Sequence, residues 1–299
     1  MKYAIGIDIG GTNTRVALVD ENYHVIVRHQ FPTDADDPEK TVQGIKAITD
    51  TFEVDIAGMG VSCPGPLDLI NGIVLDTPNL HGAWHHFPIA EELTDATGYK
   101  TYLQNDANLA ALAEAVIGEG KDYRYVQFLT VSTGLGAGFT IDKKIYIGSH
   151  GFAQELAWMC LWKGGPSHGS IYPGGIEAIS SGTAITTRAQ KAGLNVVHAG
   201  QVNNLALEGN ENAMQIMDDA KEYLSNGIAA LIETLDPDII ILGGSVALKI
   251  PGFAEEVEKR VKTKLFESVR PFVKIRKSTL GEDSGLLGAA CLAFEQAKD

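Results

Sequence analysis

The chain has 299 residues, of which 44% are hydrophobic and 21% are charged, a composition typical of an ordinary globular protein with one large or two medium domains. Its 24 Lys and Arg residues stand against 38 Asp and Glu residues, which gives a formal net charge of −14. Because no run of basic residues accumulates anywhere, these numbers argue against a nucleic-acid or an anionic-membrane partner.

The cysteines and the first residues bear on the cellular compartment. Cys63, Cys160 and Cys291 are far apart and contain no C-x-x-C pair, so they indicate neither a disulfide framework nor a zinc site. The first apolar run is too short for a signal peptide or a transmembrane span. We therefore expect a cytoplasmic protein.

Short apolar runs with β-branched residues open the chain. They predict strands at residues 3–8, 13–19 and 23–29, separated by turn residues, in an antiparallel meander. A helical pattern over residues 40–52 and an apolar strand over residues 56–61 follow.

A similar order of elements recurs about 120 residues later. Strands are predicted at residues 125–133, 139–141 and 145–147, with a glycine turn over residues 134–138. The repeated order of strand, glycine turn, strand, polar turn and strand predicts an internal structural duplication.

The rest of the chain is mostly helical. A long irregular stretch is expected over residues 149–181, and strands at residues 238–242 and near residues 272–275. The last helix, residues 284–297, has apolar residues at helical spacing and is expected to pack back on the sheet core.

Two glycine loops follow buried strands. In the first, Asp8-Ile9-Gly10-Gly11-Thr12, a carboxylate ends the strand, and the glycines let backbone amides and a hydroxyl approach a phosphate. An ordinary hairpin turn explains the same pattern. The second loop, residues 132–138, is neither a Rossmann fingerprint nor a P-loop, because a strand follows it and Gly-Lys-Ser/Thr is absent. Two such hairpins in a duplicated frame can clasp one polyphosphate from both sides.

Two further motifs have a structural and a functional interpretation. Gly243-Gly244-Ser245 ends a strand and suits either a strand-to-helix turn or the close approach of a nucleotide. Asn105 and Asp106 precede an Ala-rich helix at residues 109–117, where either residue can cap the helix. Asp106 can also be the base that deprotonates a hydroxyl attacking a γ-phosphate. Both interpretations hold if Asn105 is the cap.

The order and spacing of these motifs resemble the ROK family of bacterial sugar kinases, and the match runs from Asp8 to the last helix. Further landmarks are Ser62-Cys63-Pro64-Gly65-Pro66, Thr77-Pro78-Asn79-Leu80, Gly175-Ile176-Glu177, Ser181-Gly182-Thr183 and Leu242-Gly243-Gly244. The resemblance implies an α/β, two-lobed actin-like (hexokinase/Hsp70) fold with a duplicated ribonuclease-H-like core. We expect a smaller N-terminal lobe of residues 1–115 plus 285–299, a larger C-terminal lobe of residues 116–284, and ATP and sugar in the cleft between them.

The resemblance also implies residue roles. Asp106 would be the catalytic base, and Asp8 would hold Mg²⁺ through water. Hydrogen bonds to sugar hydroxyls would come from Asn105, Glu155 and Glu177, and Asn79 is a further candidate, although Pro-Asn is also a common turn. Contacts to the ATP phosphates would come from Gly10, Gly11, Thr12, Thr133 and Gly134, with Gly243 and Gly244 near the nucleoside.

The chain departs from the family in one segment. The family pattern Gly-Glu-Ile-Gly-His reads Gln-Glu-Leu-Ala-Trp here, so Trp158 replaces a histidine that touches sugar or metal. The family's Cys-x-Cys-Gly-x-x-Gly-Cys-x-Glu zinc segment keeps no cysteine at residues 168–177. One imidazole does not make a four-coordinate site, so we predict no structural zinc and an ordinary loop role for His168. Trp158 is expected to fill the core, with stacking on a sugar face as the alternative.

The sequence therefore predicts an ATP-dependent, glucokinase-like kinase that phosphorylates a hexose primary hydroxyl and forms a homodimer. The alternative is a kinase for a modified sugar, such as N-acetylmannosamine, fructose or a β-glucoside. A ROK-type sugar-responsive regulator is disfavoured, because the first strand begins at residue 3 without room for a DNA-binding module. A non-sugar ATPase is disfavoured because the Asn105–Asp106 pair, together with Glu155 and Glu177, suits a polyol acceptor.

Overall fold

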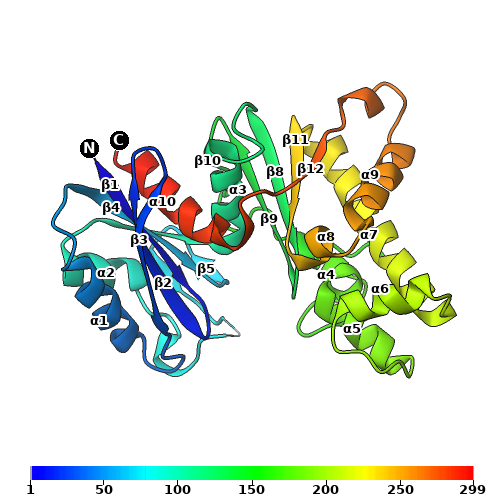
Figure 1. Ribbon diagram of the computed structural model, residues 1–299, viewed down its shortest axis with the longest axis horizontal. Helices are drawn as coiled ribbons and strands as arrows, with labels where there is room; N and C mark the ends of the chain where they lie inside the picture. The colour runs from blue at the N-terminus through cyan, green and yellow to red at the C-terminus, as the bar shows by residue number, and fades with distance from the viewer. Residues whose placement is uncertain (1, 78, 299) are drawn as a thin grey trace. The chain divides into compact units, whose positions relative to one another are not determined.

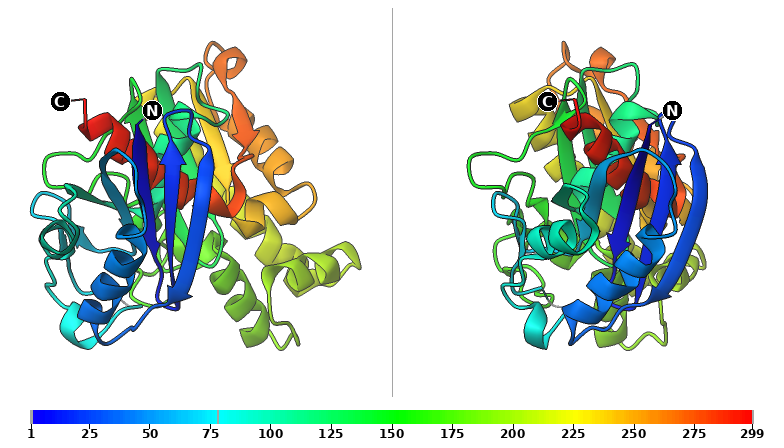
Figure 2. Two further views of the ribbon diagram at one scale, coloured as in Figure 1. Left: turned by 60° about the vertical axis from the view of Figure 1, so that its left-hand side comes forward. Right: turned by 90° about the vertical axis from the view of Figure 1, so that its left-hand side faces the viewer.

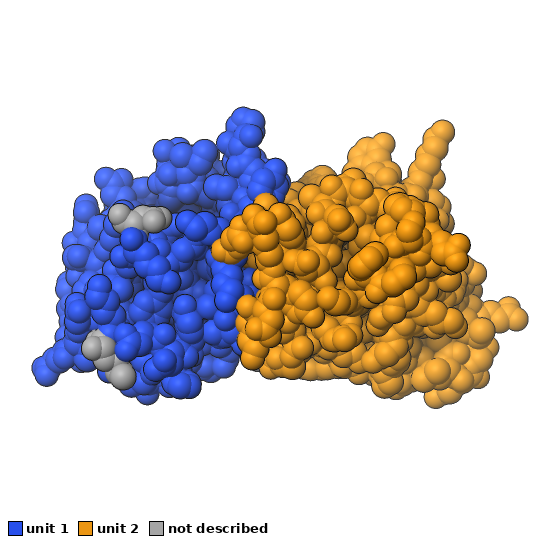
Figure 3. Space-filling model, turned by 90° about the horizontal axis from the view of Figure 1, so that it is seen from above, with its two compact units in different colours: residues 1–118, 143–153, 282–299 blue, residues 119–142, 154–281 orange. Residues whose placement is uncertain are grey.

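The computed structural model describes residues 2–77 and 79–298 and contains two compact units. The first unit comprises residues 1–118, 143–153 and 282–299, and the second comprises residues 119–142 and 154–281 (Figure 3). Each unit has its own sheet and its own hydrophobic core.

A mixed sheet forms the centre of the first unit, with strand order β3-β2-β1-β4-β7. β1 pairs antiparallel with β2, and β2 with β3, which confirms the predicted meander (Figures 1 and 2). β4 and β7 continue the sheet parallel to β1. The strands are β1 (Tyr3–Ile9), β2 (Asn13–Asp20), β3 (Val25–Pro32), β4 (Ile56–Cys63) and β7 (Thr101–Asn105). β1 and β4 are largely buried and apolar, as expected for strands covered on both faces, whereas β7 at the edge carries Gln104 and Asn105.

The helices of the first unit are α1 (Pro38–Thr49), α2 (Ile89–Thr97), α3 (Asp106–Val116) and α10 (Ser284–Gln296). Small residues let α10 lie directly on the sheet and on α3, because a Cβ at Gly60 or Gly288 would collide with the backbone of Ala289 or Leu109. The expected packing of the last helix on the sheet is confirmed. Short elements complete the unit: β5 (Leu67–Asp68), β6 (Ile73–Val74), β10 (Lys144–Ile145) and the 3₁₀ turn Gly82–Trp84.

The sheet of the second unit repeats that of the first. β8 (Tyr125–Val131) pairs antiparallel with β9 (Leu135–Ile141) and parallel with β11 (Ile239–Gly243), which in turn pairs parallel with β12 (Ile275–Lys277). The strands β9-β8-β11-β12 have the same spatial order and the same relative directions as β2-β1-β4-β7. The predicted internal duplication is thus confirmed.

Helices make up most of the second unit, as predicted. They are α4 (Ile176–Ser180), α5 (Gly182–Lys191), α6 (Ala199–Leu207), α7 (Glu211–Leu235), α8 (Ser245–Lys249) and α9 (Phe253–Lys264). Two 3₁₀ turns, Leu156–Trp158 and Arg270–Phe272, also belong to this unit. A further 3₁₀ turn, Gly281–Asp283, spans the point where the chain passes from the second unit to the first. The amphipathic α7 buries one face along the core.

Several predicted boundaries were wrong for local reasons. The third strand begins at Val25 because Asp20 accepts hydrogen bonds from the Asn22 and His24 amides and holds Tyr23 in a left-handed turn with φ 62°. The last strand begins at Ile275, since residues 270–272 form a 3₁₀ turn. The stretch over residues 149–181 is not wholly irregular, as it contains a 3₁₀ turn and α4.

Helix and strand ends shift in the same way elsewhere. The first helix begins at Pro38 rather than residue 40, because the Asp37 side chain accepts the Glu39 amide and Pro38 suits the first helical turn. The strand predicted at residues 145–147 is the two-residue β10 instead.

Among the described residues, no helix combines the length and apolar character that a bilayer crossing requires.

Candidate active site

The carboxyl ends of the parallel strands in the first unit carry the predicted catalytic residues. The register places Asp8 of β1 opposite Ser62 of β4, and Ser62 opposite Gln104 of β7. Asn105 ends β7 and Asp106 begins α3 directly afterwards. The sheet therefore brings Asp8 and the Asn105–Asp106 step to one edge.

Asn105 is the cap of helix α3, as one of the two sequence interpretations requires. Its Oδ1 accepts the Asn108 amide at 2.7 Å, and its own amide donates to Gln104 Oε1 at 2.9 Å. The same Gln104 oxygen accepts from Asn108 Nδ2 at 3.0 Å. This network fixes the turn between β7 and α3. Because it uses the side-chain Oδ1 of Asn105, the Nδ2 of Asn105 is the group left to donate to a ligand.

Asp106 is the first residue of α3 and keeps solvent-accessible surface. Its Oδ1 accepts the Ala107 amide at 2.7 Å. Protein atoms nevertheless crowd the carboxyl group, and the resulting loss of hydration raises the pKa of Asp106 above its ordinary value, an effect that the negative charge of Asp8 reinforces. A carboxylate with a raised pKa is a better proton acceptor than an ordinary surface aspartate.

Asp8 is paired with a cation that sequence reasoning did not single out. Arg15 lies opposite Asp8 on β2, and its Nε donates to Asp8 Oδ2 at 3.1 Å while its Nη2 donates to the same oxygen. The period of two along the hairpin is the signal that could have placed Arg15 beside Asp8. Since both bonds end on Oδ2, the other oxygen is the one that can face a metal-bound water.

A single carboxylate of this kind fits Mg²⁺ that is held chiefly by nucleotide phosphates and water. It does not fit a cage made by the protein alone. In the part of the chain that the structure describes, no group of three or more His, Cys, Asp or Glu side chains could hold a metal ion. His168, the remaining residue of the zinc-like segment, instead lies with Nε2 2.9 Å from Thr183 Oγ1.

The first glycine loop is a tight hairpin between β1 and β2. The Gly10 amide donates to the Asn13 carbonyl at 3.0 Å, and the Thr12 carbonyl accepts the Thr33 amide at 3.0 Å. A Cβ at Gly11 would lie 2.8 Å from the Asn79 carbonyl oxygen, so only glycine allows the exposed Asn79 segment to approach this loop so closely. Pro78, part of the same motif, lies outside the described residues.

The second glycine loop is a hairpin too, and side chains from other elements hold it. Glu177 of α4 accepts the Leu135 amide through Oε2 at 2.8 Å, and a Cβ at Gly134 would lie 2.8 Å from that oxygen. Thr183 of α5 donates its hydroxyl to the Thr133 carbonyl at 2.6 Å. The predicted sugar ligand Glu177 therefore also touches the predicted phosphate loop.

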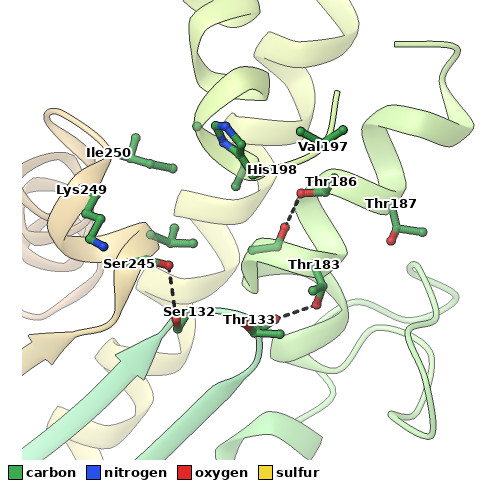
Figure 4. A pocket seen from close by; sticks show the side chains of 14 residues that line it. Ser132, Thr133, Thr183, Thr186, Thr187, Val197, His198, Ser245, Lys249 and Ile250 are labelled. Atoms are coloured by element: carbon green, nitrogen blue, oxygen red, sulfur yellow. Dashed lines mark hydrogen bonds between the residues drawn. The ribbon is translucent and has the colours of Figure 1, made fainter. Parts of the chain in front are cut away.

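The pair Gly243–Gly244 has a structural reason to be glycine. A Cβ at Gly243 would press on the Phe128 ring at 2.7 Å, and Gly244 has φ 83° with the Val131 carbonyl oxygen 2.4 Å from its would-be Cβ. Ser245 follows, and its Oγ lies 3.2 Å from Ser132 Oγ (Figure 4). The turn after β11 is thus tied to the second glycine loop.

A pocket of about 570 Å³ opens beside that loop, wholly within the second unit. Figure 4 shows the side chains of Ser132, Thr133, Thr183 and Ser245 along one side of it, with Val197, His198 and Ile250 on the opposite side. Most of its lining was missed from the sequence, although the Ser181-Gly182-Thr183 landmark pointed to one wall. The lining residues are Ser132, Thr133, Gly182, Thr183, Thr186, Thr187, Val197, His198, Ala199, Gly200, Ser245, Val246, Lys249 and Ile250.

The segment that departs from the family pattern is held by Trp162. Its ring stacks on Tyr223 with centroids 4.8 Å apart, and the Arg188 guanidinium lies 5.8 Å from its centroid. Trp158 does not fill the core, because 47% of its surface is exposed; the core-filling expectation was wrong. Glu155, which precedes the 3₁₀ turn of Trp158, is exposed as well.

Comparison with known proteins agrees with these features. The sequence profile of the ROK family matches residues 4–296. A glucokinase of Thermotoga maritima is 30% identical, with 98% of this chain and 97% of that protein covered, and an N-acetylmannosamine kinase of Salmonella newport is 31% identical, with 97% of each covered. The crystal structure of a ROK hexokinase from Thermus thermophilus superposes with a TM-score of 0.91 at 32% identity and covers 99% of both chains. The fold is that of these kinases, the duplicated actin-like ATPase fold.

Proposed function

Since the chain belongs to the ROK family, we propose that it is an ATP-dependent sugar kinase that transfers the γ-phosphate to the primary hydroxyl of a hexose. The observation that carries the proposal is that Asn105, and not Asp106, caps helix α3. Asn105 caps the helix, so the Asp106 carboxylate is not needed for capping and can act as a base.

Asp106 is proposed to accept the proton of the attacking sugar hydroxyl. Its crowded surroundings and the nearby Asp8 charge raise its pKa, which increases its basicity. Phosphoryl transfer needs little covalent assistance from the protein, so aligning the hydroxyl with the phosphate is the larger part of this role.

Asp8 is proposed to hold the Mg²⁺ of MgATP through water, with Arg15 fixing the carboxylate from its other oxygen. The ion would neutralise charge on the transferring phosphoryl group. The Gly11 amide and the Thr12 hydroxyl are proposed to bind phosphate oxygens, because the hairpin leaves Thr12 exposed. Gly10, whose amide already donates to the Asn13 carbonyl, is proposed to contact the phosphates only through the close approach of its backbone. From the second unit, Thr133 and Gly134 are proposed to bind phosphate oxygens as well.

The pocket beside the second glycine loop is proposed to hold the nucleoside of ATP. Its volume of about 570 Å³ suits a ligand of that size. Hydroxyls of Thr133 and Ser245 suit ribose and phosphate oxygens, whereas Thr183, whose proton goes to the Thr133 carbonyl, can only accept from a ribose hydroxyl. Val246 and Ile250 offer apolar area for a base, and Gly243 and Gly244 lie just before them along the chain.

The sugar is proposed to bind Asn79, Asn105, Glu155 and Glu177. Asn105 would donate through Nδ2, and Glu177 would accept a sugar hydroxyl while one of its oxygens remains on the Leu135 amide. The exposed Trp158 ring offers a flat apolar surface for the C–H face of a pyranose or for a substituent. A modified sugar is therefore the alternative substrate, and it is favoured by this one residue.

The experiment that tests the proposal is a coupled ADP-release screen. Purified protein is given MgATP with glucose, mannose, fructose, N-acetylmannosamine, allose or a β-glucoside. We expect ADP release that depends on one of these sugars. Equal ADP release without any sugar would contradict the proposal and favour a non-sugar ATPase.

Two smaller parts of the proposal concern assembly and location. We propose a homodimer in the cytoplasm without nucleic-acid or membrane partners, in keeping with the net charge of −14. Light scattering after size exclusion reports the mass directly, and a monomer at micromolar concentration would contradict the dimer.

A further inference from the structure

The side chain of His168 ends on a hydroxyl that is already engaged with the second glycine loop. His168 Nε2 lies 2.9 Å from Thr183 Oγ1, and Thr183 Oγ1 lies 2.6 Å from the Thr133 carbonyl oxygen. All three residues belong to the second unit. The chain of contacts therefore runs from the 154–175 segment through α5 to the turn between β8 and β9.

The chemistry of the three groups fixes the direction of both hydrogen bonds. A carbonyl oxygen only accepts, so the single hydroxyl proton of Thr183 must be donated to Thr133. Thr183 can then only accept from His168, which requires a proton on Nε2 of the imidazole. The pair is thus a directed relay in which His168 donates to Thr183 and Thr183 donates to Thr133.

Both ends of this relay are anchored. At one end, the Ile171 amide donates to the His168 carbonyl at 3.0 Å, and the buried Ile171 packs with Ala157 and Ala178, which holds the turn that presents the imidazole. At the other end, the Thr133 carbonyl also accepts the Thr183 amide at 3.3 Å. His168 therefore contacts α5 from a fixed turn rather than from a free loop.

Thr183 occupies a position that matters for ligand binding. It lines the pocket of the second unit, and the adjacent Gly182 amide donates to the Ser132 carbonyl at 2.7 Å. The hydroxyl rotamer of Thr183 decides whether the Thr133 carbonyl keeps the shorter of its two hydrogen bonds to α5. If that hydroxyl rotates away, the turn loses a short hydrogen bond next to the pocket.

We propose that His168 is a positioning residue for the nucleotide side of the reaction: by donating to Thr183 it holds the Thr133–Gly134 turn in the conformation that receives phosphate. This inference rests on the proposed kinase function. It assigns His168 an action through Thr183 on a protein turn, with no contact to the substrates. It also links the segment that carries Glu155 and Trp158 to the phosphate loop.

Three variants test the relay. His168→Ala removes the donor, Thr183→Val removes the hydroxyl at equal size, and His168→Gln keeps an N–H donor and is the matched control. We expect His168→Ala to raise the KM for ATP about fivefold, the effect of losing one neutral hydrogen bond, with the KM for the sugar within about twofold. His168→Gln should restore the KM for ATP to within about twofold of the unaltered protein.

A double-mutant cycle separates positioning from general stability. If His168 acts through Thr183, adding His168→Ala to Thr183→Val should change the KM for ATP by less than about twofold further. If the two substitutions instead raise the KM for ATP independently, so that their fold-changes multiply in the double variant, the relay is overturned. Thermal unfolding of each variant shows whether any change merely follows a loss of fold.

Amide hydrogen exchange gives a readout that needs no catalysis. In nucleotide-free protein, a peptide covering residues 131–138 should exchange faster in His168→Ala and in Thr183→Val, and at the normal rate in His168→Gln. Faster exchange in a protein without sugar-dependent activity would sustain the relay while the kinase proposal fails. Unchanged exchange and unchanged KM in an active kinase would overturn the relay alone.

Discussion

The two glycine loops share one topology but are held in different ways. The first, between β1 and β2, is fixed mainly by backbone bonds: Gly10 to Asn13 and Thr33 to Thr12. The second, between β8 and β9, has a backbone bond of its own, from the Ser132 amide to the Gly134 carbonyl. It is held in addition by the side chains of Glu177 and Thr183, and through Thr183 by His168. Changes far from the second loop along the chain should therefore reach it, whereas the first should respond chiefly to changes within its own hairpin.

The units also differ in charge at these loops. Asp8, Arg15 and Asp106 lie at the strand ends of the first unit, whereas the pocket of the second unit is lined by hydroxyls, apolar groups and few charges. We interpret the first unit as the part that carries the base and the metal contact, and the second as the part that binds the nucleoside. Five sets of measurements test this division.

Asp106→Asn should have the largest effect. A general base contributes about 10²- to 10⁴-fold, so we expect kcat to fall about 10³-fold with nucleotide binding retained. Steady-state kinetics and ADP calorimetry check this, with Asp122→Asn, an exposed carboxylate elsewhere, as the matched control. Turnover within about tenfold of normal would show that Asp106 is not the base.

One glycine-to-alanine substitution in each loop allows the stability of the two loops to be compared directly. Gly11→Ala forces a Cβ to within 2.8 Å of the Asn79 backbone oxygen, whereas Gly134→Ala meets the movable carboxylate of Glu177 at the same distance. Overpacking against backbone costs about 2 kcal/mol, so Gly11→Ala should lower the free energy of unfolding more. Gly134→Ala should instead displace Glu177 and raise the KM for both substrates. Equal losses of stability in the two variants would contradict the view that the first loop packs against backbone and the second against a movable side chain.

Two tryptophans test how the 154–175 segment is held. Trp162→Ala removes the stack on Tyr223 and the contact with Arg188, and we expect a loss of about 2 kcal/mol of stability. Trp158→Ala removes an exposed ring and should cost less than about 0.5 kcal/mol while changing the KM for the sugar. Chemical denaturation and sugar kinetics distinguish them, and a reversed order of stability would place Trp158 in the core after all.

The pH profile should reflect Asp106. The base must be ionised, and its pKa is raised above the ordinary 3.8, so kcat/KM should fall as the pH drops through that raised value. The acid limb should therefore lie at higher pH than an ordinary aspartate produces. A flat profile through the acid range, with circular dichroism showing an intact fold, would contradict the assignment.

The smallest expected effect is that of zinc removal. Since His168 donates to Thr183 through Nε2 and the three family cysteines are replaced, a zinc-stripping chelator followed by Mg²⁺ should leave activity unchanged. Elemental analysis of the purified protein should find no stoichiometric zinc. One zinc per chain, lost together with activity, would show that the segment binds metal in another way.

Much of the fold could be predicted from local patterns. The β1-β2-β3 meander, the duplicated order of strands and the packing of α10 all follow from periodicity and turn residues. The ends of elements were less accurate, because side-chain bonds decide them: Asp20 delays β3, and Asp37 starts α1 early. Such bonds depend on geometry that periodicity does not contain.

The site could be predicted in part. The cap at Asn105 was one of two sequence interpretations, and the structure supports it. Arg15 beside Asp8 could have been found from strand register, but the contact between Thr183 and His168 and the far wall of the pocket could not. They come together only through tertiary contacts between α5, the 168–171 turn and the loop after β8. The exposure of Trp158 also depends on what packs around it, which the sequence does not state.

The most direct test of the central claim follows the transferred phosphate. The protein is incubated with MgATP and the sugar that responds in the ADP-release screen, and ADP and phosphorylated sugar are quantified together by mass spectrometry. We predict one phosphorylated sugar for each ADP, with the phosphate on the primary hydroxyl, and loss of both products in Asp106→Asn. Release of ADP with inorganic phosphate in place of a phosphorylated sugar would contradict the account.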